Sequence, residues 1–436
     1  MKYVFITGGV VSGLGKGITA ASIGRLLINR GFRVNVQKHD VYLNADTGNM
    51  NPLRHGEAFI TDDGAETDLD IGHYERFMGR HLNKTSNSTM GKIYSSILAK
   101  ERNGEFCGKD VQVVPHITDE IKNVLREAGK DADIVLIELG GTVGDIESMV
   151  VVEALRQFRQ ELGPQGSVSV HLTLVPKLES SGEVKTKPTQ HSVQTLNRMG
   201  IYPDIIVCRT NADVELDREL REKIVMFCNL GSIDDVIHAK DCKSIYEVPI
   251  HLKNQKLDDI ILKKLGLKAP KDNLADWKKM VENMYKTNGQ KKTIGIIGEY
   301  AQASDAYLSV IEAVKAASLA TGVHTQIVLA TEPNKFDAII AHGAPGAASE
   351  YARVNNIPFL GVGSHPSAPH TPGLQTVVPT NTLAYAKERF RTRDTTKPDI
   401  ITLDNHPFHV TTQFHPEFLS KPYHAHPLFI KLLESI

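Results

Sequence analysis

Short apolar runs alternate with segments of helical spacing along the first half of the chain. The apolar runs at 3–7, 34–38, 134–138, 168–174 and 205–209 are bounded by turn residues and are typical of buried parallel strands. Apolar residues recur at helical spacing over 19–30, 118–128 and 190–199. This alternation predicts an α/β fold with a doubly wound parallel sheet, in which ligands bind at the carboxyl ends of the strands.

A second α/β pattern follows a polar, lysine-rich stretch that contains Trp277, the only tryptophan. It comprises an apolar run at 293–298, a helical pattern at 306–319 and apolar runs at 338–341 and 358–362. We therefore expect a first domain at 1–267, a linker with one helix at 268–292, and a second domain at 293–436.

Composition places the chain among ordinary globular proteins, with 41% hydrophobic and 23% charged residues. The formal net charge of −1 gives no overall field that favours nucleic acid or an anionic membrane surface. The four cysteines form no CxxC pair, which favours reduced thiols and a cytoplasmic location. We expect neither a signal peptide at the start, which reads as a strand, nor a membrane span.

A glycine-rich loop connects the first predicted strand to the first predicted helix. Residues 8–19 read GGVVSGLGKGIT, so backbone amides can turn toward phosphate oxygens while Lys16 adds a mobile charge. The usual P-loop spacing is not met, because five residues separate Gly9 from Gly15 and Gly17 stands where a magnesium-ligating hydroxyl is usual. The alternative is a glycine-rich turn with a chance lysine, but the strand–loop–helix context favours a phosphate site.

Carboxylates elsewhere have to hold magnesium if the loop lacks its hydroxyl ligand. Asp70 ends the acidic segment DDGAETDLD, and Glu138 closes the predicted strand IVLIE. The alternatives are a solvated acidic loop for the first and a capping carboxylate for the second. Their expected place at the carboxyl edge of the sheet favours metal binding.

Seven segments together resemble the CTP synthase family over nearly the whole chain. They are SGLGKGI from Ser12, TDDGAETDLDIGHYERF from Thr61, ELGGTVGDIES from Glu138, KTKPTQHSV from Lys185, CR from Cys208, REKIVMFCN from Arg221 and SIYEVP from Ser244. Enzymes of this family phosphorylate the 4-oxygen of UTP with ATP and then displace phosphate with ammonia, which arrives through a tunnel from a class I glutaminase domain. The resemblance implies a P-loop NTPase-like, dethiobiotin-synthetase-like domain, a reduced flavodoxin-like class I glutamine-amidotransferase domain, and a homotetramer.

The resemblance also implies a role for each matching residue. Lys16 and Lys38 are expected to stabilise the transferred phosphoryl group, and Asp70 and Glu138 to hold Mg²⁺. The residues expected to bind ATP are Gly13, Leu14, Gly15, Lys16, Gly17, Ile18, Asp70, Arg209, Lys240, Asp241 and Cys242. Those expected to bind the pyrimidine nucleotide are Ser12, Asp145, Ile146, Glu147, Lys185, Thr186, Lys187, Pro188, Thr189, Gln190 and Lys223. Taken alone, the lysines of the second set would read as solvated surface residues.

The second domain departs from the family at its nucleophile. It keeps His415 and Glu417 of a glutaminase active site, but no cysteine lies beyond Cys242. Gly363 stands where the family has its cysteine, and Ser364 is one position out of register. Because such a glutaminase attacks with a thiolate, we interpret Gly363, His415 and Glu417 as relics of a site that no longer hydrolyses glutamine.

Two further changes affect the same domain. Pro345 in the loop that supplies the oxyanion site removes an amide donor, and the interval from Gly363 to His415 is much shorter than in the family. Leu308 replaces a lysine, a change that affects coupling between the domains and activation by GTP. These losses are coherent with a degenerate glutaminase domain.

The loop at 40–58 keeps the family's frame with altered details. Val41 and Thr47 replace prolines, which loosens the unliganded loop. In the family this loop lines the end of the ammonia tunnel, and the corresponding residues here are Pro52, Arg54, His55 and Ala58. These changes indicate either neutral sequence drift after ammonia ceased to pass through the tunnel, or a reshaped pocket for an amine or a base.

Three functions follow from these observations. The first is an ATP-dependent ligase that converts UTP to CTP with free ammonia, or with ammonia from a separate glutaminase partner. The second is a specialised paralogue that aminates a modified pyrimidine nucleotide or uses a larger amine. The third is a non-catalytic paralogue that regulates a true synthase, although the retention of Lys16, Lys38, Asp70 and Glu138 argues against it.

Overall fold

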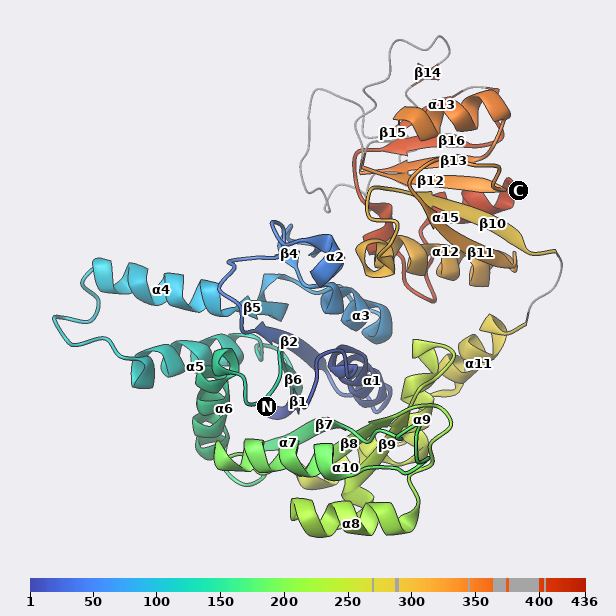
Figure 1. Ribbon diagram of the computed structural model, residues 1–436. Helices are drawn as coiled ribbons and strands as arrows, with labels where there is room; N and C mark the ends of the chain where they lie inside the picture. The colour runs from blue at the N-terminus through green and yellow to red at the C-terminus, as the bar shows by residue number, and fades with distance from the viewer. Residues whose placement is uncertain (269, 287–289, 344–345, 364–373, 376–399, 404) are drawn as a thin grey trace. The chain divides into compact units, whose positions relative to one another are not determined.

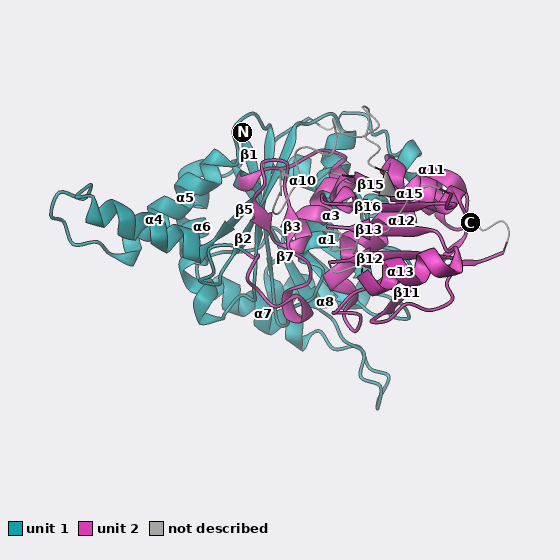
Figure 2. Cartoon of the chain, turned by 90° about the horizontal axis from the view of Figure 1, so that it is seen from above, with its two compact units in different colours: residues 1–46, 85–278 teal, residues 47–84, 279–436 magenta. Residues whose placement is uncertain are grey.

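The computed structural model describes residues 1–436 except 269, 287–289, 344–345, 364–373, 376–399 and 404. Its described residues form two compact units (Figure 2). Unit 1 comprises residues 1–46 and 85–278, and unit 2 comprises residues 47–84 and 279–436. Each unit contains its own seven-stranded sheet.

Unit 1 is built on a sheet whose strand pairs are all parallel (Figure 1). In spatial order its strands are β5 (Asn87–Thr89), β2 (Val34–Asp40), β6 (Ile134–Leu139), β1 (Lys2–Gly8), β7 (Ser167–Leu174), β8 (Ile205–Thr210) and β9 (Val236–Lys240). The order reverses at β1, with β6 on one side and β7 on the other. The site is therefore expected where β1 ends.

Helices cover both faces of this sheet, as the alternation of buried side chains requires. They are α1 (Lys16–Asn29), α4 (Met90–Arg102), α5 (Thr118–Glu127), α6 (Met149–Leu162), α7 (Lys187–Arg198), α8 (Arg218–Cys228), α9 (Val248–Asn254) and α10 (Leu257–Lys264), while α11 (Ala275–Met284) spans the boundary between the two units. Tyr3 and Phe5 of β1 join one core with residues of α4, α5 and α6. Val4 and Ile6, also buried, point to the opposite face, where α1 packs.

Unit 2 contains a second α/β sheet of flavodoxin-like order. Its strands are β11 (Thr325–Ala330), β10 (Lys292–Ile297), β12 (Ala338–His342), β13 (Phe359–Val362), β16 (His409–Thr412), β15 (Ile400–Leu403) and β14 (Leu374–Gln375). The first five pair in parallel and the last two antiparallel. The helices of this part are α12 (Leu308–Thr321), α13 (Gly346–Asn355) and α15 (Pro427–Glu434).

Residues 47–84 belong to unit 2, although the sequence places them inside the first predicted domain. They form α2 (Pro52–His55), a small antiparallel ribbon of β3 (Phe59–Ile60) and β4 (Glu66–Thr67), and α3 (Leu69–Met78). Polar and aromatic contacts join residues 47–84 to the rest of unit 2. Ser309 donates from its backbone to Glu57 and accepts from Arg76, while the rings of Phe59 and Phe418 lie edge to face at 4.9 Å.

The predicted fold class is confirmed. The five apolar runs of the first half are β1, β2, β6, β7 and β8, and the predicted linker helix is α11. The helix predicted from residue 19 begins earlier, at Lys16, because Gly15 adopts the left-handed conformation that starts it. Among the described residues, no helix combines the length and apolar character that a membrane crossing requires.

Candidate functional site

The glycine-rich loop lies where β1 ends and α1 begins. Gly15 precedes α1 with φ of 84°, and no side chain caps the first turn, which also lacks acidic residues. Lys16 is the first helical residue, and its Nζ donates to the Gly141 carbonyl over 2.7 Å. The loop thus combines a helix N-terminus with a lysine, the arrangement that binds phosphate.

Three buried polar side chains, those of Thr7, His171 and Ser192, form a series of contacts beside this loop. Thr7 Oγ1 and His171 Nδ1 lie 2.8 Å apart, and His171 Nε2 lies 2.9 Å from Ser192 Oγ. Burial, with a smaller contribution from Lys16, lowers the pKa of His171 to about 3, so this imidazole stays neutral. Sequence reasoning missed His171. The only signal was a histidine inside a strand that the sequence predicts to be buried.

Lys38 and Glu138 face each other across the strands beside the loop. They are register partners on β2 and β6, so their side chains leave the same face of the sheet, and both are buried. Lys38 Nζ also lies 3.7 Å from Asp40 Oδ1, and Asn87 and Tyr42 donate to that carboxylate. Asp40, which sequence reasoning did not select, adds a buried carboxylate to this edge.

Most residues expected to bind ATP lie together in unit 1. Leu14, Gly15, Ile18, Arg209, Lys240 and Cys242 line one cavity of 180 Å³. Arg209 connects its walls, because it donates to the Leu14 carbonyl over 3.2 Å and pairs with Asp241 at 2.8 Å. Gly15 has φ of 84°, a left-handed conformation that favours glycine, and a β-carbon there would lie 2.8 Å from Arg209 Nη1.

The residues expected to bind the pyrimidine nucleotide lie in several segments of unit 1, with Ser12 in the glycine-rich loop. Lys187 begins α7, where Gln190 donates to Thr186 over 3.1 Å, and Lys185 pairs with Glu183. Lys187 lies 5.5 Å from the ring centroid of Phe227, which shares α8 with Lys223. Asp145, Ile146 and Glu147 are all exposed, at the start of the 3-10 helix η3 (Ile146–Ser148) that precedes α6. None of these contacts identifies a ligand, so the assignments stay predictions.

Asp70 and the residues of the predicted amine path lie in unit 2. Asp70 occupies the first turn of α3, where its amide donates to Asp68 Oδ1 over 2.9 Å. Its predicted partnership with Glu138, which belongs to unit 1, stays a prediction. Pro52 and Ala58 line a cavity of 880 Å³, whereas Arg54 and His55 are exposed residues of α2.

The residues that the sequence analysis interprets as glutaminase relics lie close together in unit 2. His415 lines the cavity of 880 Å³, and His415 Nδ1 lies 2.7 Å from Glu417 Oε1. Gly363 directly follows β13 with φ of 62°, and a β-carbon there would meet His415 Cε1 at 2.2 Å. The space that a nucleophilic side chain needs is therefore filled by imidazole. Ser364 and Pro345 lie outside the described residues.

His342 is a further member of this group that sequence reasoning did not select. Its Nε2 lies 3.8 Å from Glu417 Oε1, and its ring centroid lies 5.5 Å from that of His415. The loop that follows β12 supplies the oxyanion site in the family, so position alone could have suggested His342. His342 and His415 both line the cavity, and the buried carboxylate of Glu417 lies close to both imidazoles.

Comparisons with known proteins agree with this geometry. The family model described as the CTP synthase N-terminus matches residues 2–267. The chain is 42% identical to the CTP synthase of Carboxydothermus hydrogenoformans, over 98% of this chain and 97% of that protein. It is 41% identical to the CTP synthase of Staphylococcus aureus, over 100% of this chain and 98% of that protein.

The alignment with these relatives contains positions at which this chain has no residue. The alignment with the Carboxydothermus protein runs over 524 positions and the chain has 436 residues, so at least 88 positions have no counterpart here. Among solved structures, the glutaminase domain of Trypanosoma brucei CTPS with bound acivicin is similar over 33% of this chain and 93% of that one. Its identity of 18% and TM-score of 0.26 are too low to carry an argument. The family model and the full-length relatives suffice: the chain belongs to the CTP synthase family.

Proposed function

We propose that this chain uses ATP to convert UTP to CTP through a 4-phosphorylated intermediate, and that its nitrogen comes from free ammonia. Membership of the family supports the overall reaction. One observation carries the choice of nitrogen source: residue 363 has no side chain, and His415 fills the space beside it. A glutaminase of this class cannot form its thioester without a thiolate.

Phosphoryl transfer is assigned to the edge of the sheet in unit 1. The γ-phosphoryl group moves from ATP to the 4-oxygen of UTP, and negative charge spreads over its equatorial oxygens. Lys16 at the start of α1 and Lys38 on β2 supply fixed positive charge for that group. The Arg209 cavity takes the adenine, so that the phosphates of ATP extend toward the glycine-rich loop.

Magnesium is implied by the family, and the donor set fits it. Glu138 is a buried carboxylate and Asp70 a partly buried one, and hard oxygen ligands of this kind suit Mg²⁺. When bound, the ion neutralises charge on the phosphates. In unit 1, Glu138 would hold it, while Lys16 and Lys38 orient the phosphoryl group.

Amination completes the proposed reaction. Ammonia adds to C4, phosphate leaves, and the nitrogen gives up its surplus proton. Ammonia from solution or from a separate glutaminase partner would serve equally, since the chemistry needs only NH₃ at C4. The exposed apolar side chains of Ile146, Met149, Met226 and Phe227 support the proposal of a homotetramer, because such side chains often mark subunit contacts.

Product formation tests the proposal. Purified protein with ATP, Mg²⁺ and UTP is expected to form CTP with ammonium chloride, as followed by absorbance and chromatography. If no CTP forms with ammonium, and ATP hydrolysis depends instead on another pyrimidine nucleotide, that nucleotide and not UTP is the substrate. The absence of any nucleotide-dependent turnover would instead favour a regulatory, non-catalytic paralogue.

A second candidate function is amination by an amine larger than ammonia. The cavity in unit 2 supports it, because 880 Å³ is far more than ammonia needs and the walls include both Pro52 and Ala58 of the predicted amine path. Competition between methylamine and ammonium at equal free-base concentration tests this candidate. Predominant N4-methyl product, identified by mass spectrometry, would favour it, and predominant CTP would reject it.

A further inference from the structure

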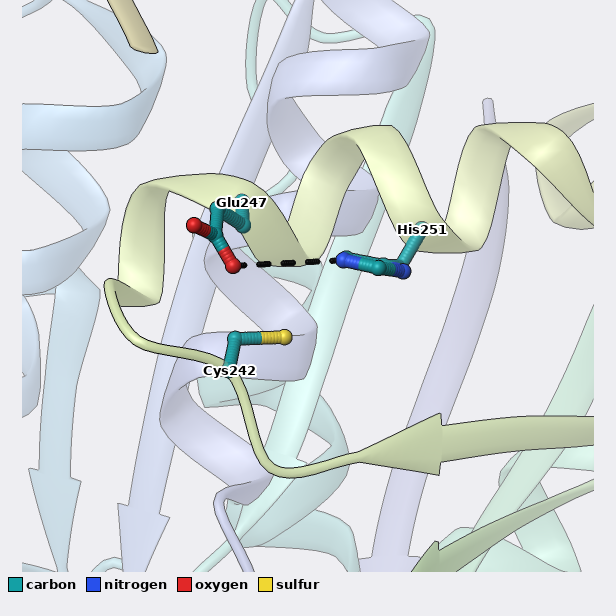
Figure 3. Close-up of side chains that lie close together, drawn as sticks. All are labelled: Cys242, Glu247 and His251. Carbon is teal, nitrogen blue, oxygen red and sulfur yellow. Dashed lines mark ion pairs between the residues drawn. The ribbon is translucent and has the colours of Figure 1, made fainter. Parts of the chain in front are cut away.

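Three metal-binding side chains converge at one end of β9 in unit 1. Cys242 lies in the turn after β9, Glu247 ends the short 3-10 helix η5 (Ile245–Glu247), and His251 lies on α9. Their ligand atoms all lie within 4.8 Å of one another, and Glu247 Oε2 is 4.0 Å from His251 Nε2. Figure 3 shows the thiol pointing toward the gap between the carboxylate and the imidazole.

Local structure explains why these side chains meet. Glu247 and His251 are four residues apart, a spacing that puts both on one face of a helix. Ser244 caps the helical segment by accepting from the Tyr246 amide, and the carbonyl of buried Tyr246 accepts from the Trp277 indole over 2.8 Å. The segment that carries Glu247 and His251 is therefore held in place by these contacts, and Cys242 approaches it from the turn.

The donor set selects a particular class of metal. Thiolate and imidazole are ligands of Zn²⁺ and similar transition metals, whereas Mg²⁺ prefers oxygen. Zinc–ligand distances of about 2.0–2.3 Å place tetrahedral ligands roughly 3.5 Å apart, so closure around an ion needs shifts of about 1 Å. All three side chains are partly exposed, which gives an ion access from solvent.

We propose that Cys242, Glu247 and His251 bind one Zn²⁺ ion per chain. Neighbouring positive charge is already offset, because Arg209 pairs with Asp241 and Lys240 pairs with Glu215 at 2.7 Å. The site is distinct from the Mg²⁺ site in its residues and its ligand chemistry. Three protein ligands leave a fourth position for water.

The site shares a wall with the cavity assigned to adenine. Cys242 and His251 both line that cavity, so an ion between them changes its shape and its charge. Bound Zn²⁺ is therefore expected to weaken ATP binding. This consequence rests on the proposed function, whereas metal binding itself does not.

Cobalt titration tests the proposal directly, since Co²⁺ substitutes for Zn²⁺ and a cobalt–thiolate bond absorbs in the near ultraviolet. The metal-free full chain is expected to bind one equivalent of Co²⁺ with a thiolate band that stoichiometric Zn²⁺ removes. Cys242→Ser should abolish the band, while Glu247→Gln and His251→Gln should weaken Co²⁺ binding by at least about tenfold. Circular dichroism establishes that each variant is folded.

Two controls distinguish this site from others in the chain. Cys107 is an exposed cysteine elsewhere in unit 1, so Cys107→Ser should leave the band unchanged. The other described group of suitable ligands, His342, His415 and Glu417, contains no sulfur, so His342→Gln should also leave it unchanged. No band in the native chain, or a band lost with Cys107 and kept without Cys242, would overturn the proposal.

A measurement on the unmodified chain gives a second test. Zn²⁺ should slow alkylation of Cys242 by iodoacetamide at least about tenfold and leave Cys107 unaffected, as quantified by peptide mass spectrometry. Equal rates with and without Zn²⁺ would contradict the site. Zinc binding without any change in ATP affinity would contradict only the link to the adenine cavity.

Discussion

His415 occupies the space that a side chain on residue 363 would need, because its Cε1 lies 2.2 Å from the ideal β-carbon position on Gly363. Gly363 nevertheless keeps φ of 62° at the end of β13, as expected for the sharp turn that presents a nucleophile. Gly363 therefore keeps the left-handed backbone of such a position but has no nucleophilic side chain. The His415 ring lies in the space next to Gly363, and its Nδ1 is hydrogen-bonded with Glu417.

Restoring the cysteine alone is expected to fail. Gly363→Cys should release no glutamate from glutamine, because the new side chain meets the His415 ring, and it should destabilise the chain by about 1–3 kcal/mol through overpacking. Glutamate release and urea denaturation measure the two effects.

Gly322→Cys provides the matched control for strain. Gly322 also has positive φ, at 74°, but nothing lies within 4 Å of its would-be β-carbon. Gly322→Cys should therefore lower the free energy of unfolding by only about 1 kcal/mol, the cost of a left-handed backbone conformation for a residue with a side chain. Glutaminase activity in Gly363→Cys would show that the site needs only its thiol.

Removal of either lysine charge should abolish synthesis while preserving the fold. Lys16→Met and Lys38→Met should each lower kcat for CTP formation about 10²–10³-fold, since each removes a charge expected on the transferred phosphoryl group. Lys130→Met, which breaks only an exposed pair with Glu127, should leave kcat unchanged. Normal turnover by Lys16→Met would exclude the glycine-rich loop as the phosphate site.

Arg209 should govern affinity for ATP rather than for the pyrimidine. Arg209→Met removes the hydrogen bond to Leu14 and the pair with Asp241, so KM for ATP should rise about tenfold while KM for UTP stays constant. Arg218→Met, which breaks an exposed pair with Glu222, serves as the control. Equal increases in both KM values would place Arg209 in a general structural role.

Glu57 should make stability depend on pH. Burial raises the pKa of Glu57 from its ordinary 4.5 to about 7, against opposing contributions from Arg76 and Ser309. The folded chain therefore binds a proton that the unfolded chain has lost, and stability should fall by about 1–3 kcal/mol as pH rises from 4.5 to 7. Glu57→Gln should remove this fall, and Glu299→Gln, at an exposed residue, should retain it. Urea denaturation at pH 5 and pH 8 measures this loss of stability. If Glu57→Gln shows the same loss, other titratable groups cause it.

The fold was largely predictable because buried parallel strands leave a strong sequence signal. Apolar runs such as those of β1 and β6 are uninterrupted and bounded by turn residues. The attachment of residues 47–84 to unit 2 was not predictable, since it depends on contacts such as Glu57 with Ser309, 252 residues apart. A local pattern carries no information about such a partner.

The candidate site was predictable where a motif concentrates its residues. The glycine-rich loop and KTKPTQ are local, so they were found. The partners of His171 and Asp40 include Thr7 and Asn87 on other strands, and the local sequence of each residue does not reveal such a partner. Cys242, Glu247 and His251 are near in sequence, but only the turn after β9 brings the thiol to the helix face.

The origin of the transferred nitrogen tests the account most directly. Purified chain would be given ATP, Mg²⁺ and UTP with equal concentrations of ¹⁵N-labelled ammonium and unlabelled glutamine, and the CTP examined by mass spectrometry. The account predicts CTP whose 4-amino nitrogen is ¹⁵N, with no release of glutamate. Unlabelled CTP with stoichiometric glutamate, formed by protein free of any other glutaminase, would contradict it.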